Sequence, residues 1–281
     1  MKNMANEAQL ALVEKAKAGD KEALEKVILS VQDLVFNLSL RMLGTFSDAE
    51  EASQDILLKI VTNLSTFKGE SAFSTWVFRV ATNHLKNYQK HMFAKFPLSF
   101  EFYRDDIKNG RIDDVPDLTQ DVERSILAEE LKLSCTNVML QCLDAESRCI
   151  FILGTMFKVD SRIAGDILEF TPEAYRQRLS RIRSEVAGFL KEYCGEYGHG
   201  RCRCVNRVNY AIQNHRISPA QLDFATAIPM ETMVEVKAAM EDIDDLSQEF
   251  AFYKTYQSPE KLKGFIQEFL DGAACSVIKN A

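Results

Sequence analysis

Hydrophobic residues recur every three to four positions along most of this chain, and few residues interrupt the pattern. The 281 residues include only 12 Gly and 6 Pro, and runs in which β-branched and polar residues alternate are scarce. Strict alternation would indicate strands, whereas the observed spacing indicates amphipathic helices. The sequence therefore predicts an all-α fold.

Capping signals give the expected ends of individual helices. Gly19-Asp20 separates two helical stretches near the N-terminus. Ser47, with Glu50 three residues later, has the form of a capping box. Asp144 is a good N-cap, and Thr171-Pro172 combines an N-cap with a proline at the first helical position. We expect a helix to begin at each of these points.

Changes in composition predict two small helical domains and three further segments. The stretch after Pro97 is rich in Asp and has no hydrophobic periodicity, so we expect it to be extended or disordered in part. The predicted boundaries are 1–98 for the first domain, 99–121 for an acidic linker, 122–193 for the second domain, 194–216 for a basic Cys- and Gly-rich segment, and 217–281 for an acidic helical tail.

The net charge of −7 hides an uneven distribution. Residues 99–149 carry 6 basic and 12 acidic groups, and residues 217–281 carry 5 and 11, whereas residues 150–216 carry 11 and 7. A second basic island lies within Lys68–Leu98. Such blocks suggest a polyanionic partner for the basic islands. From charge alone, solvated helix faces are the alternative.

Several classes of protein are disfavoured by what the sequence lacks. No apolar stretch reaches the ~20 residues of a membrane span, and Met1–Gly19 lacks the apolar core of a signal peptide. We therefore expect a cytoplasmic protein without membrane contact, whose seven cysteines are thiols or metal ligands. No phosphate loop, nucleophile–base pair or paired carboxylates stand out, so we do not expect an enzyme.

The segment Asp160–Arg183 has the form of a helix-turn-helix. Its second helix is studded with arginines, while Leu179, Ile182 and Val186 are spaced to face inward. The second helix of this motif enters the DNA major groove, where Arg pairs with guanine and Gln with adenine. An Arg-rich solvated helix is the alternative. The candidate DNA-binding residues are Arg176, Gln177, Arg178, Ser180, Arg181 and Arg183.

The other basic island, Phe67–Tyr88, interleaves aromatic, amide and basic side chains. That mixture suits single-stranded nucleic acid, because bases stack on rings while amides pair with exposed base edges. The signal is weak alone, since Trp76 and Phe78 at these spacings are more often core residues.

Together these segments resemble a known family. Ser47–Asp55 and Phe67–Asn83 resemble region 2 of the extracytoplasmic-function (ECF) sigma factors, the smallest class of the bacterial sigma-70 family, and Asp144–Leu190 resembles their region 4. The resemblance covers about residues 8–190, and Glu169 stands where the turn commonly has Gly. It implies an RNA polymerase sigma factor that directs transcription initiation at promoter −10 and −35 elements.

The resemblance also implies partners and roles for individual residues. The β′ clamp of core RNA polymerase would contact region 2, the β flap would contact region 4, and the acidic linker would thread a channel that normally holds RNA. An anti-sigma factor is a further candidate partner, and no cofactor is required. The core-binding residues would be Asp48, Glu50, Glu51, Gln54 and Asp55. The −10 residues would be Lys68, Ser71, Arg79, Asn83, Lys86 and Asn87. The six residues of the Arg-rich helix would read the −35 element.

The alternative function is a stand-alone helix-turn-helix transcriptional regulator. Such a protein would bind duplex DNA without polymerase. It would need neither the acidic face of 48–55 nor the −10 segment.

The cysteines fall into two groups. Cys194, His199, Cys202 and Cys204 lie within eleven residues and are a permitted ligand set for structural zinc. A thiol redox sensor and an inert packing role are the alternatives. The cysteines at 135, 142 and 149 recur every seven residues among hydrophobic side chains and are predicted to lie in the core.

The acidic tail carries two hydrophobic stripes at helical spacing, and its three prolines at 219, 229 and 259 indicate helix starts. A helix with such a stripe needs a surface to bury it. We expect the tail to pack back on one of the domains, as a regulator that covers a basic surface or as a stabilising appendage. The stripes are Met230, Met233, Val234, Val236 and Met240, then Leu262, Phe265, Ile266, Phe269 and Leu270.

Overall fold

The computed structural model describes residues 2–88, 92–110, 117–225 and 256–271. Within these ranges the chain is helical and has no strand, only isolated bridges at Cys194–Cys202 and Ser218–Gln221. The predicted all-α fold is confirmed. The α-helices are α1 (Lys2–Lys17), α2 (Lys21–Leu43), α3 (Phe46–Thr62), α4 (Phe73–Lys86), α5 (Met92–Lys95), α6 (Phe100–Asn109), α7 (Arg124–Met139), α8 (Ala145–Phe151), α9 (Ser161–Leu168), α10 (Pro172–Tyr193), α11 (Cys204–Gln213) and α13 (Glu260–Asp271). Shorter turns are the 3₁₀ segments η1 (Leu64–Thr66) and η2 (Leu140–Cys142) and the π-helix η3 (Ile152–Met156).

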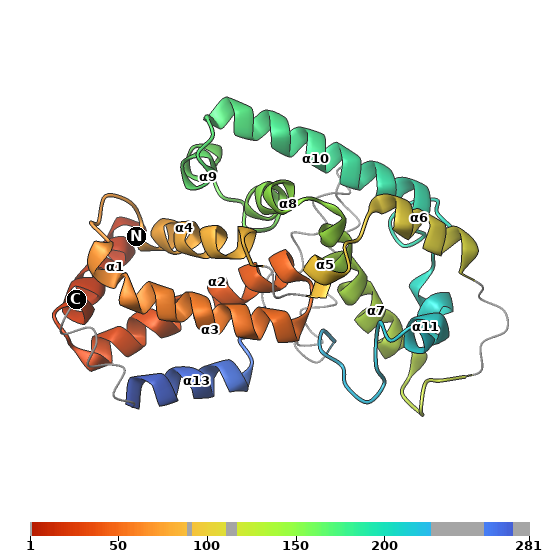
Figure 1. The fold of residues 1–281 in the computed structure, drawn as a ribbon, viewed down its shortest axis with the longest axis horizontal. Coiled ribbons are helices and arrows are strands. Elements are labelled where there is room, and N and C mark those ends of the chain that lie inside the picture. Colours follow the sequence, from red (N-terminus) through yellow and green to blue (C-terminus); the bar gives the residue numbers. More distant parts are fainter. Residues whose placement is uncertain (1, 89–91, 111–116, 226–255, 272–281) are drawn as a thin grey trace.

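Helices α1 to α4 form an N-terminal bundle around α2 (Figure 1). α2 contacts the other three helices of the bundle, and its side chains Phe36 and Leu38 are fully buried. Asp20 caps α2 by accepting a hydrogen bond from the backbone N–H of Ala23 at 3.0 Å. The predicted break at Gly19-Asp20 is therefore confirmed.

The predicted cap of α3 is wrong by two residues. Thr45, not Ser47, is the N-cap: its Oγ1 accepts from the backbone N–H of Asp48 at 3.2 Å and donates to Asp48 Oδ2 at 2.7 Å. Gly44 ends α2 immediately before it with a φ of 88°, a conformation open to Gly. Because that turn is so short, α3 begins earlier than the box at Ser47 and Glu50 indicated.

The helix-turn-helix is confirmed in α9 and α10. The predicted N-caps Asp144 and Thr171 each accept a hydrogen bond from a backbone N–H in the first turn of α8 and α10, and Asp160 caps α9 in the same way. Glu169, in the turn, has a φ of 63°, in the left-handed region that Gly occupies without strain. Tyr175 is buried and its hydroxyl donates to Ile150 O at 3.0 Å, which fixes α10 against α8.

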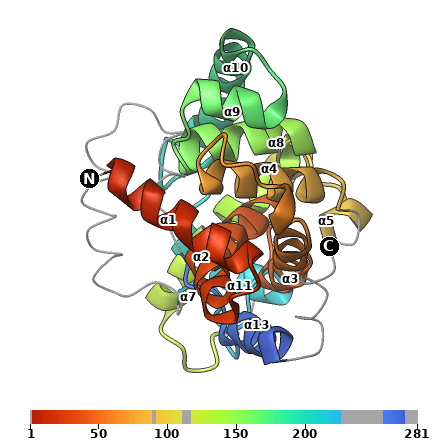
Figure 2. The same cartoon turned by 90° about the vertical axis from the view of Figure 1, so that its left-hand side faces the viewer.

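Two buried arginines join the two halves of the molecule. Arg148 on α8 donates to Met42 O at the end of α2 at 2.5 Å and to Leu140 O at 2.9 Å. Arg41 on α2 donates to the side chain of Asn137 on α7. Hydrophobic residues of both halves belong to one core, so the predicted first and second domains lie against each other (Figure 2).

The linker at 99–121, predicted to be extended or disordered in part, forms a helix in its first half. α6 occupies 100–109, where Ser99 caps it by accepting from Phe102 N–H at 3.1 Å. Asp106 ties α6 to α11, about one hundred residues away in sequence. No local pattern reports so distant a contact. Residues 111–116 lie outside the described part of the chain.

Part of the tail packs back on the N-terminal bundle, as expected. α13 begins directly after Pro259 and lies against α3 and α2 (Figures 1 and 2). Its side chains Leu262 and Ile266 are buried in the common core. Pro219 begins no helix, contrary to prediction. The expected helix start at Pro229 and the stripe of Met230, Met233, Val234, Val236 and Met240 lie outside the described residues.

Candidate nucleic-acid interface

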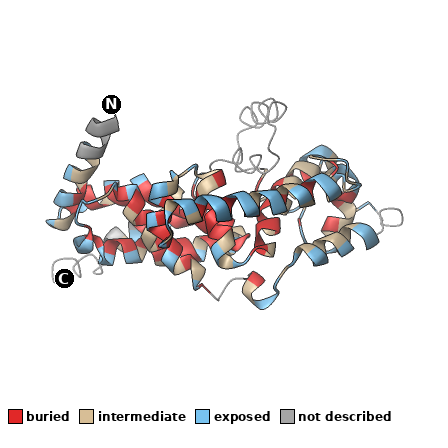
Figure 3. Cartoon of the chain, turned by 90° about the horizontal axis from the view of Figure 1, so that it is seen from above, coloured by how far each residue is buried: buried red, intermediate tan, exposed pale blue. Residues whose placement is uncertain are grey.

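The Arg-rich face of α10 points to solvent. Figure 3 looks onto this helix, whose outward side is largely exposed. Arg176 donates to Glu173 at 2.8 Å and to Ser161 Oγ at 3.1 Å, and Arg178 donates to Glu146. Such surface ion pairs are weak and salt-sensitive, so a phosphate or a base edge can replace them. The exposed predicted residues are Arg176, Gln177, Arg178, Ser180 and Arg181.

Arg183 differs from the other predicted residues of α10. It is half-buried, and its guanidinium donates to Thr155 Oγ1 at 3.0 Å and to Gly154 O at 3.1 Å. A Cβ at Gly154 would lie 2.4 Å from Leu179 Cδ2, so only Gly lets α10 approach the π-helix this closely. Arg183 therefore fastens α10 to η3 and borders the exposed face rather than forming it. A groove of about 440 Å³ along this border is lined by Arg176, Leu179, Ser180, Arg183, Ser184 and Ala187.

The predicted −10 residues lie on α4 and on the turn before it. Lys68, Asn83 and Asn87 are exposed, whereas Ser71 and Lys86 are half-buried. Asn87 Nδ2 donates to Asn83 O at 3.1 Å, so the two amides lie one turn apart. The structure thus brings the basic and amide side chains together on one helix.

The aromatic residues of this segment pack internally. The ring of Phe78 meets Phe157 edge-on, with centroids 5.2 Å apart, and Trp76 stacks on Phe73 at 5.6 Å. Phe78 is buried and Trp76 half-buried. The core role suggested by the sequence therefore fits both rings.

Helix α9 covers part of this surface. Arg79 on α4 donates to Asp166 Oδ2 on α9 at 2.6 Å, and Phe78 and Phe157 make a contact between the same two halves. Arg79 is consequently held by the helix-turn-helix half of the chain. This contact could not be predicted from the sequence, because both residues have the pattern of exposed polar positions on separate domains.

The predicted core-binding residues lie along α3, with different neighbours on its two sides. Glu51 is exposed, and Asp48, Gln54 and Asp55 are half-buried. On the side of α4, His84 Nε2 lies 3.9 Å from Asp55. Burial and the Glu51 carboxylate raise the pKa of the Tyr88 hydroxyl. Neither contact could be predicted from the sequence, since His84 on α4 and Tyr88 just after it reach α3 only through the packing of the bundle.

On its other side, α3 meets the tail. Lys261 Nζ on α13 lies 3.7 Å from Glu50 Oε2, and the Glu50 side chain keeps only 20% of its exposure. The expectation that the tail covers a basic surface is therefore wrong for its described part, which lies on the acidic helix α3. Charge complementarity is local here, between one lysine and one glutamate.

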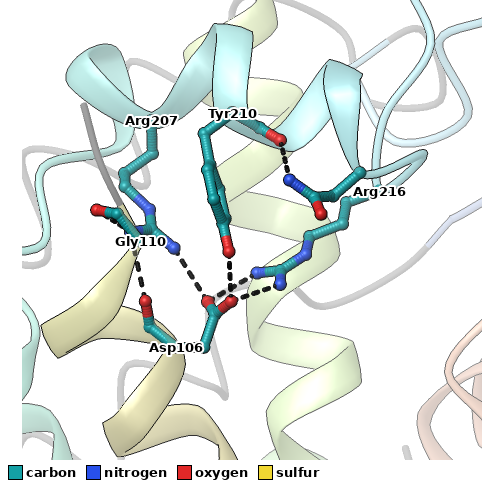
Figure 4. A network of polar contacts seen from close by, with 6 residues as sticks. Asp106, Gly110, Arg207, Tyr210 and Arg216 are labelled. Atoms are coloured by element: carbon teal, nitrogen blue, oxygen red, sulfur yellow. Dashed lines mark hydrogen bonds and ion pairs between the residues drawn. The ribbon is translucent and has the colours of Figure 1, made fainter. Parts of the chain in front are cut away.

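A buried carboxylate joins the linker helix to α11 (Figure 4). Asp106 accepts from Arg207 at 2.8 Å, from both terminal nitrogens of Arg216 at 2.8 and 2.6 Å, and from the hydroxyl of Tyr210 at 2.6 Å. Burial alone would raise the pKa of Asp106, but the hydrogen bonds from Arg216 and Tyr210 and the charges of both arginines outweigh it and lower that pKa. This network could not be predicted from the sequence, because nothing local distinguishes Asp106 from the other acidic residues of the linker.

The four predicted zinc ligands, Cys194, His199, Cys202 and Cys204, all lie in the described part of the chain. No group of three or more His, Cys, Asp or Glu is arranged there to hold a metal ion. Cys194, Cys202 and Cys204 are half-buried, whereas His199 is exposed and its backbone N–H donates to Lys191 O at 3.2 Å. Zinc at these four residues stays a prediction.

The other cysteines lie deeper. Cys149 is fully buried in the core, which confirms that prediction, while Cys135 and Cys142 are half-buried at its edge. Burial raises the pKa of Cys142 and of Cys149 to about 12. Burial and the neighbouring Cys202, Cys204 and Cys194 raise the pKa of Cys135. Cys135 on α7 is therefore a neighbour of the 194–204 segment that sequence spacing could not reveal.

Among the helices described, none is both long and apolar enough to cross a membrane.

Comparisons with known proteins identify relatives of this chain among the sigma factors. The family described as Sigma-70 region 2 matches residues 27–91, which include α3 and α4. The chain is similar to the RNA polymerase sigma-H factor of Pseudomonas aeruginosa, at 24% identity over 185 residues, 65% of this chain and 94% of that protein. It is also similar to the ECF RNA polymerase sigma-E factor of Haemophilus influenzae, at 30% identity over 151 residues, 48% of this chain and 79% of that protein. The sigma-E factor of Escherichia coli strain K12 is 35% identical over 77 residues, 27% of this chain and 40% of that protein.

Proposed function

The chain belongs to the ECF sigma factors of the sigma-70 family and acts in transcription initiation, and from this premise we propose that it binds core RNA polymerase and reads promoter −10 and −35 elements within the holoenzyme. Sigma factors are not enzymes, and they generally need no cofactor. The observation that carries the proposal is the presence, in one chain, of an exposed Arg-rich recognition helix and a region 2 match over the α3–α4 pair.

For the −35 element, the proposed readers lie on the exposed face of α10. Arg176 and Arg178 have guanidinium groups at the surface, where each can fork onto a guanine in the major groove. Gln177, Ser180 and Arg181 would add base or phosphate contacts. We assign Arg183 a supporting part, since it holds α10 to η3.

For the −10 element, the proposed readers are Lys68, Ser71, Arg79, Asn83, Lys86 and Asn87. The amides of Asn83 and Asn87 suit hydrogen bonds to an extruded base, while the basic residues suit phosphates. Since Arg79 is paired with Asp166, this function requires α9 to leave α4 before the −10 strand binds. The two domains, 1–98 and 122–193, would then separate and reach the two promoter elements.

For core polymerase, the proposed surface is the acidic α3. Asp48, Glu50, Glu51, Gln54 and Asp55 would contact the β′ clamp coiled coil, and region 4 would contact the β flap. The acidic linker, 99–121, would thread the RNA channel, which requires Asp106 to leave Arg207 and Arg216. The 217–281 tail has no part in promoter reading in this scheme.

The discriminating experiment combines core polymerase pull-down with run-off transcription. We expect the purified full chain to bind core polymerase and to start transcription at one set of promoters. A chain that ignored core polymerase but repressed transcription from duplex DNA would instead be a stand-alone helix-turn-helix regulator. Elemental analysis of the same preparation tests the zinc prediction for Cys194, His199, Cys202 and Cys204.

A further inference from the structure

The tail segment Tyr256–Asp271 lies against α2 and α3, and α3 is the helix that we assign to core polymerase. We propose that this segment and core polymerase compete for the α2–α3 face, so that in the free chain the Glu50 side of the polymerase-binding helix is covered. The inference rests on the proposed role of α3 and goes beyond it, because it assigns the tail the part of a built-in competitor.

The tail is held by specific hydrogen bonds to Asn37 and Asp33 of α2. Asn37 Nδ2 donates to Tyr256 O at 2.8 Å, and Asn37 Oδ1 accepts from Tyr256 N–H at 2.9 Å. Asp33 Oδ1 accepts from both the backbone N–H and the hydroxyl of Ser258, at 2.9 and 2.5 Å. Tyr256 and Ser258 are almost completely buried. Paired donors and acceptors of this kind define one position for the tail, which loose hydrophobic contact would not do.

Aromatic packing around Tyr256 adds to these hydrogen bonds. The ring of Tyr256 meets Phe46, the first residue of α3, and Phe224, with centroids 5.6 and 5.8 Å apart. Phe46 and Phe224 also meet each other edge-on at 4.9 Å. Three rings from three parts of the chain therefore close over the start of α3.

Residues 223–225, near the start of the tail, are held in place as well. The carboxylate of Glu130 on α7 accepts hydrogen bonds from the backbone N–H groups of Asp223, Phe224 and Ala225 at 2.7 to 3.2 Å. Residues 223–225 and 256–258 thus meet the protein at one place, through Phe224 and Tyr256. Residues 223–225 and the segment that begins at Tyr256 are therefore held at the same place on the protein.

After Pro259, α13 occupies the side of α3 that carries Glu50. Leu262 and Ile266 are 0% and 3% exposed, so this contact buries the centre of the hydrophobic stripe of α13. Lys261 lies beside Glu50, and it supplies the positive charge that the acidic face of α3 would otherwise find on a partner. A helix with its side chains is ~10 Å across. A partner helix therefore cannot reach Glu50 from this side while α13 is in place.

The test compares two variants of the full chain for binding to purified core polymerase. Leu262→Asp with Ile266→Asp puts two charges into the buried stripe and should release α13. Lys263→Asp is the matched control, because in the described part of the chain Lys263 pairs within α13, with Glu260 at 2.7 Å. We expect the released variant to bind core polymerase at least tenfold more tightly than the wild type, and the control to bind like the wild type. Hydrogen exchange of α13 amides verifies the release, and the thermal melt verifies that the bundle remains folded.

Hydrogen exchange of the wild type with core polymerase gives a second readout that needs no variant. Competition requires the α13 amides to lose protection in the complex. Retained protection of α13 in the complex would overturn the proposal, as would unchanged affinity in a variant whose α13 is released. If core polymerase binds the wild type and the released variant equally well, the sigma-factor function stands and only the competition fails. If neither binds, the proposed function fails and the competition with it.

Discussion

Arg79 on α4 and Asp166 on α9 form an ion pair with a nitrogen–oxygen distance of 2.6 Å, which connects the region 2 half of the chain to the helix-turn-helix half. Both side chains are partly exposed, at 42% and 65%, so the pair contributes only ~0–1 kcal/mol to stability. The common core and the buried Arg41 and Arg148 hold the two halves together, so this weak contact adds little and can yield to DNA and polymerase.

Reversing the charge of Asp166 should open this contact. In Asp166→Lys, a lysine faces Arg79, and we expect faster hydrogen exchange in α9, while the radius of gyration stays unchanged because the common core still joins the halves. Glu185→Lys makes the same change of net charge on the exposed side of α10 and should leave the exchange of α9 unchanged. Equal effects of the two variants would mean that net charge, not the loss of the pair, speeds the exchange of α9.

The Asp106 network should be far more important for stability. Asp106→Asn leaves the side chain of Arg207, only 5% exposed, without its counter-charge, and we expect a loss of ~3 kcal/mol in the free energy of unfolding. Asp105→Asn is the matched control, because Asp105 pairs at the surface with Arg104 and its loss should not be measurable. Urea unfolding of both variants gives the comparison. Similar losses would show that the network contributes no more than a surface pair.

The same network predicts a dependence on acid. Since the folded pKa of Asp106 lies below its ordinary value of 3.8, its contribution is complete above that value and is lost as the pH falls through the folded pKa. The difference in stability between wild type and Asp106→Asn should therefore shrink below about pH 4. Glu130 behaves in the opposite sense, because burial raises its pKa and outweighs its backbone hydrogen bonds. A difference that stays constant from pH 7 to pH 3 would contradict the assigned direction for Asp106.

Different arginines of α10 should fail in different ways. Arg176→Ala and Arg178→Ala should each weaken −35 binding by ~1–3 kcal/mol if they contact bases, with the melting temperature unchanged. Arg183→Ala should lower the melting temperature as well, since it removes the hydrogen bonds to Thr155 and Gly154. Duplex binding assays with changed −35 bases, together with thermal melts, separate the two effects. If Arg183→Ala kept the wild-type melting temperature but lost −35 binding, Arg183 would belong to the face of α10 that contacts DNA.

Asn83 provides the corresponding test for the −10 element. Asn83 is exposed on α4, and its backbone carbonyl accepts a hydrogen bond from the side chain of Asn87. We expect Asn83→Ala to impair open-complex formation, measured by permanganate reactivity of the melted strand, while core polymerase binding stays intact. Equal loss of both activities would place Asn83 in the polymerase interface instead.

Local signals in the sequence determined much of the fold and of the candidate site. The caps at Asp20, Asp144, Asp160 and Thr171 act through the next three residues, so they can be read without tertiary information. The exposure of Arg176 and the burial of Leu179 follow from helical periodicity in the same way. The division into basic and acidic blocks likewise indicated the two helices that we propose to bind DNA.

Only the tertiary structure decided which of these surfaces are free. Asp106 meets Arg207, Arg79 meets Asp166, and Asn37 meets Tyr256 across separations of 87 to 219 residues. Such pairs depend on how whole helices pack, and a single sequence gives each partner the same signature as a solvated polar residue. The sequence therefore determined what each helix is able to contact, and the packing of α9, α11 and α13 decided what each one contacts in the free protein.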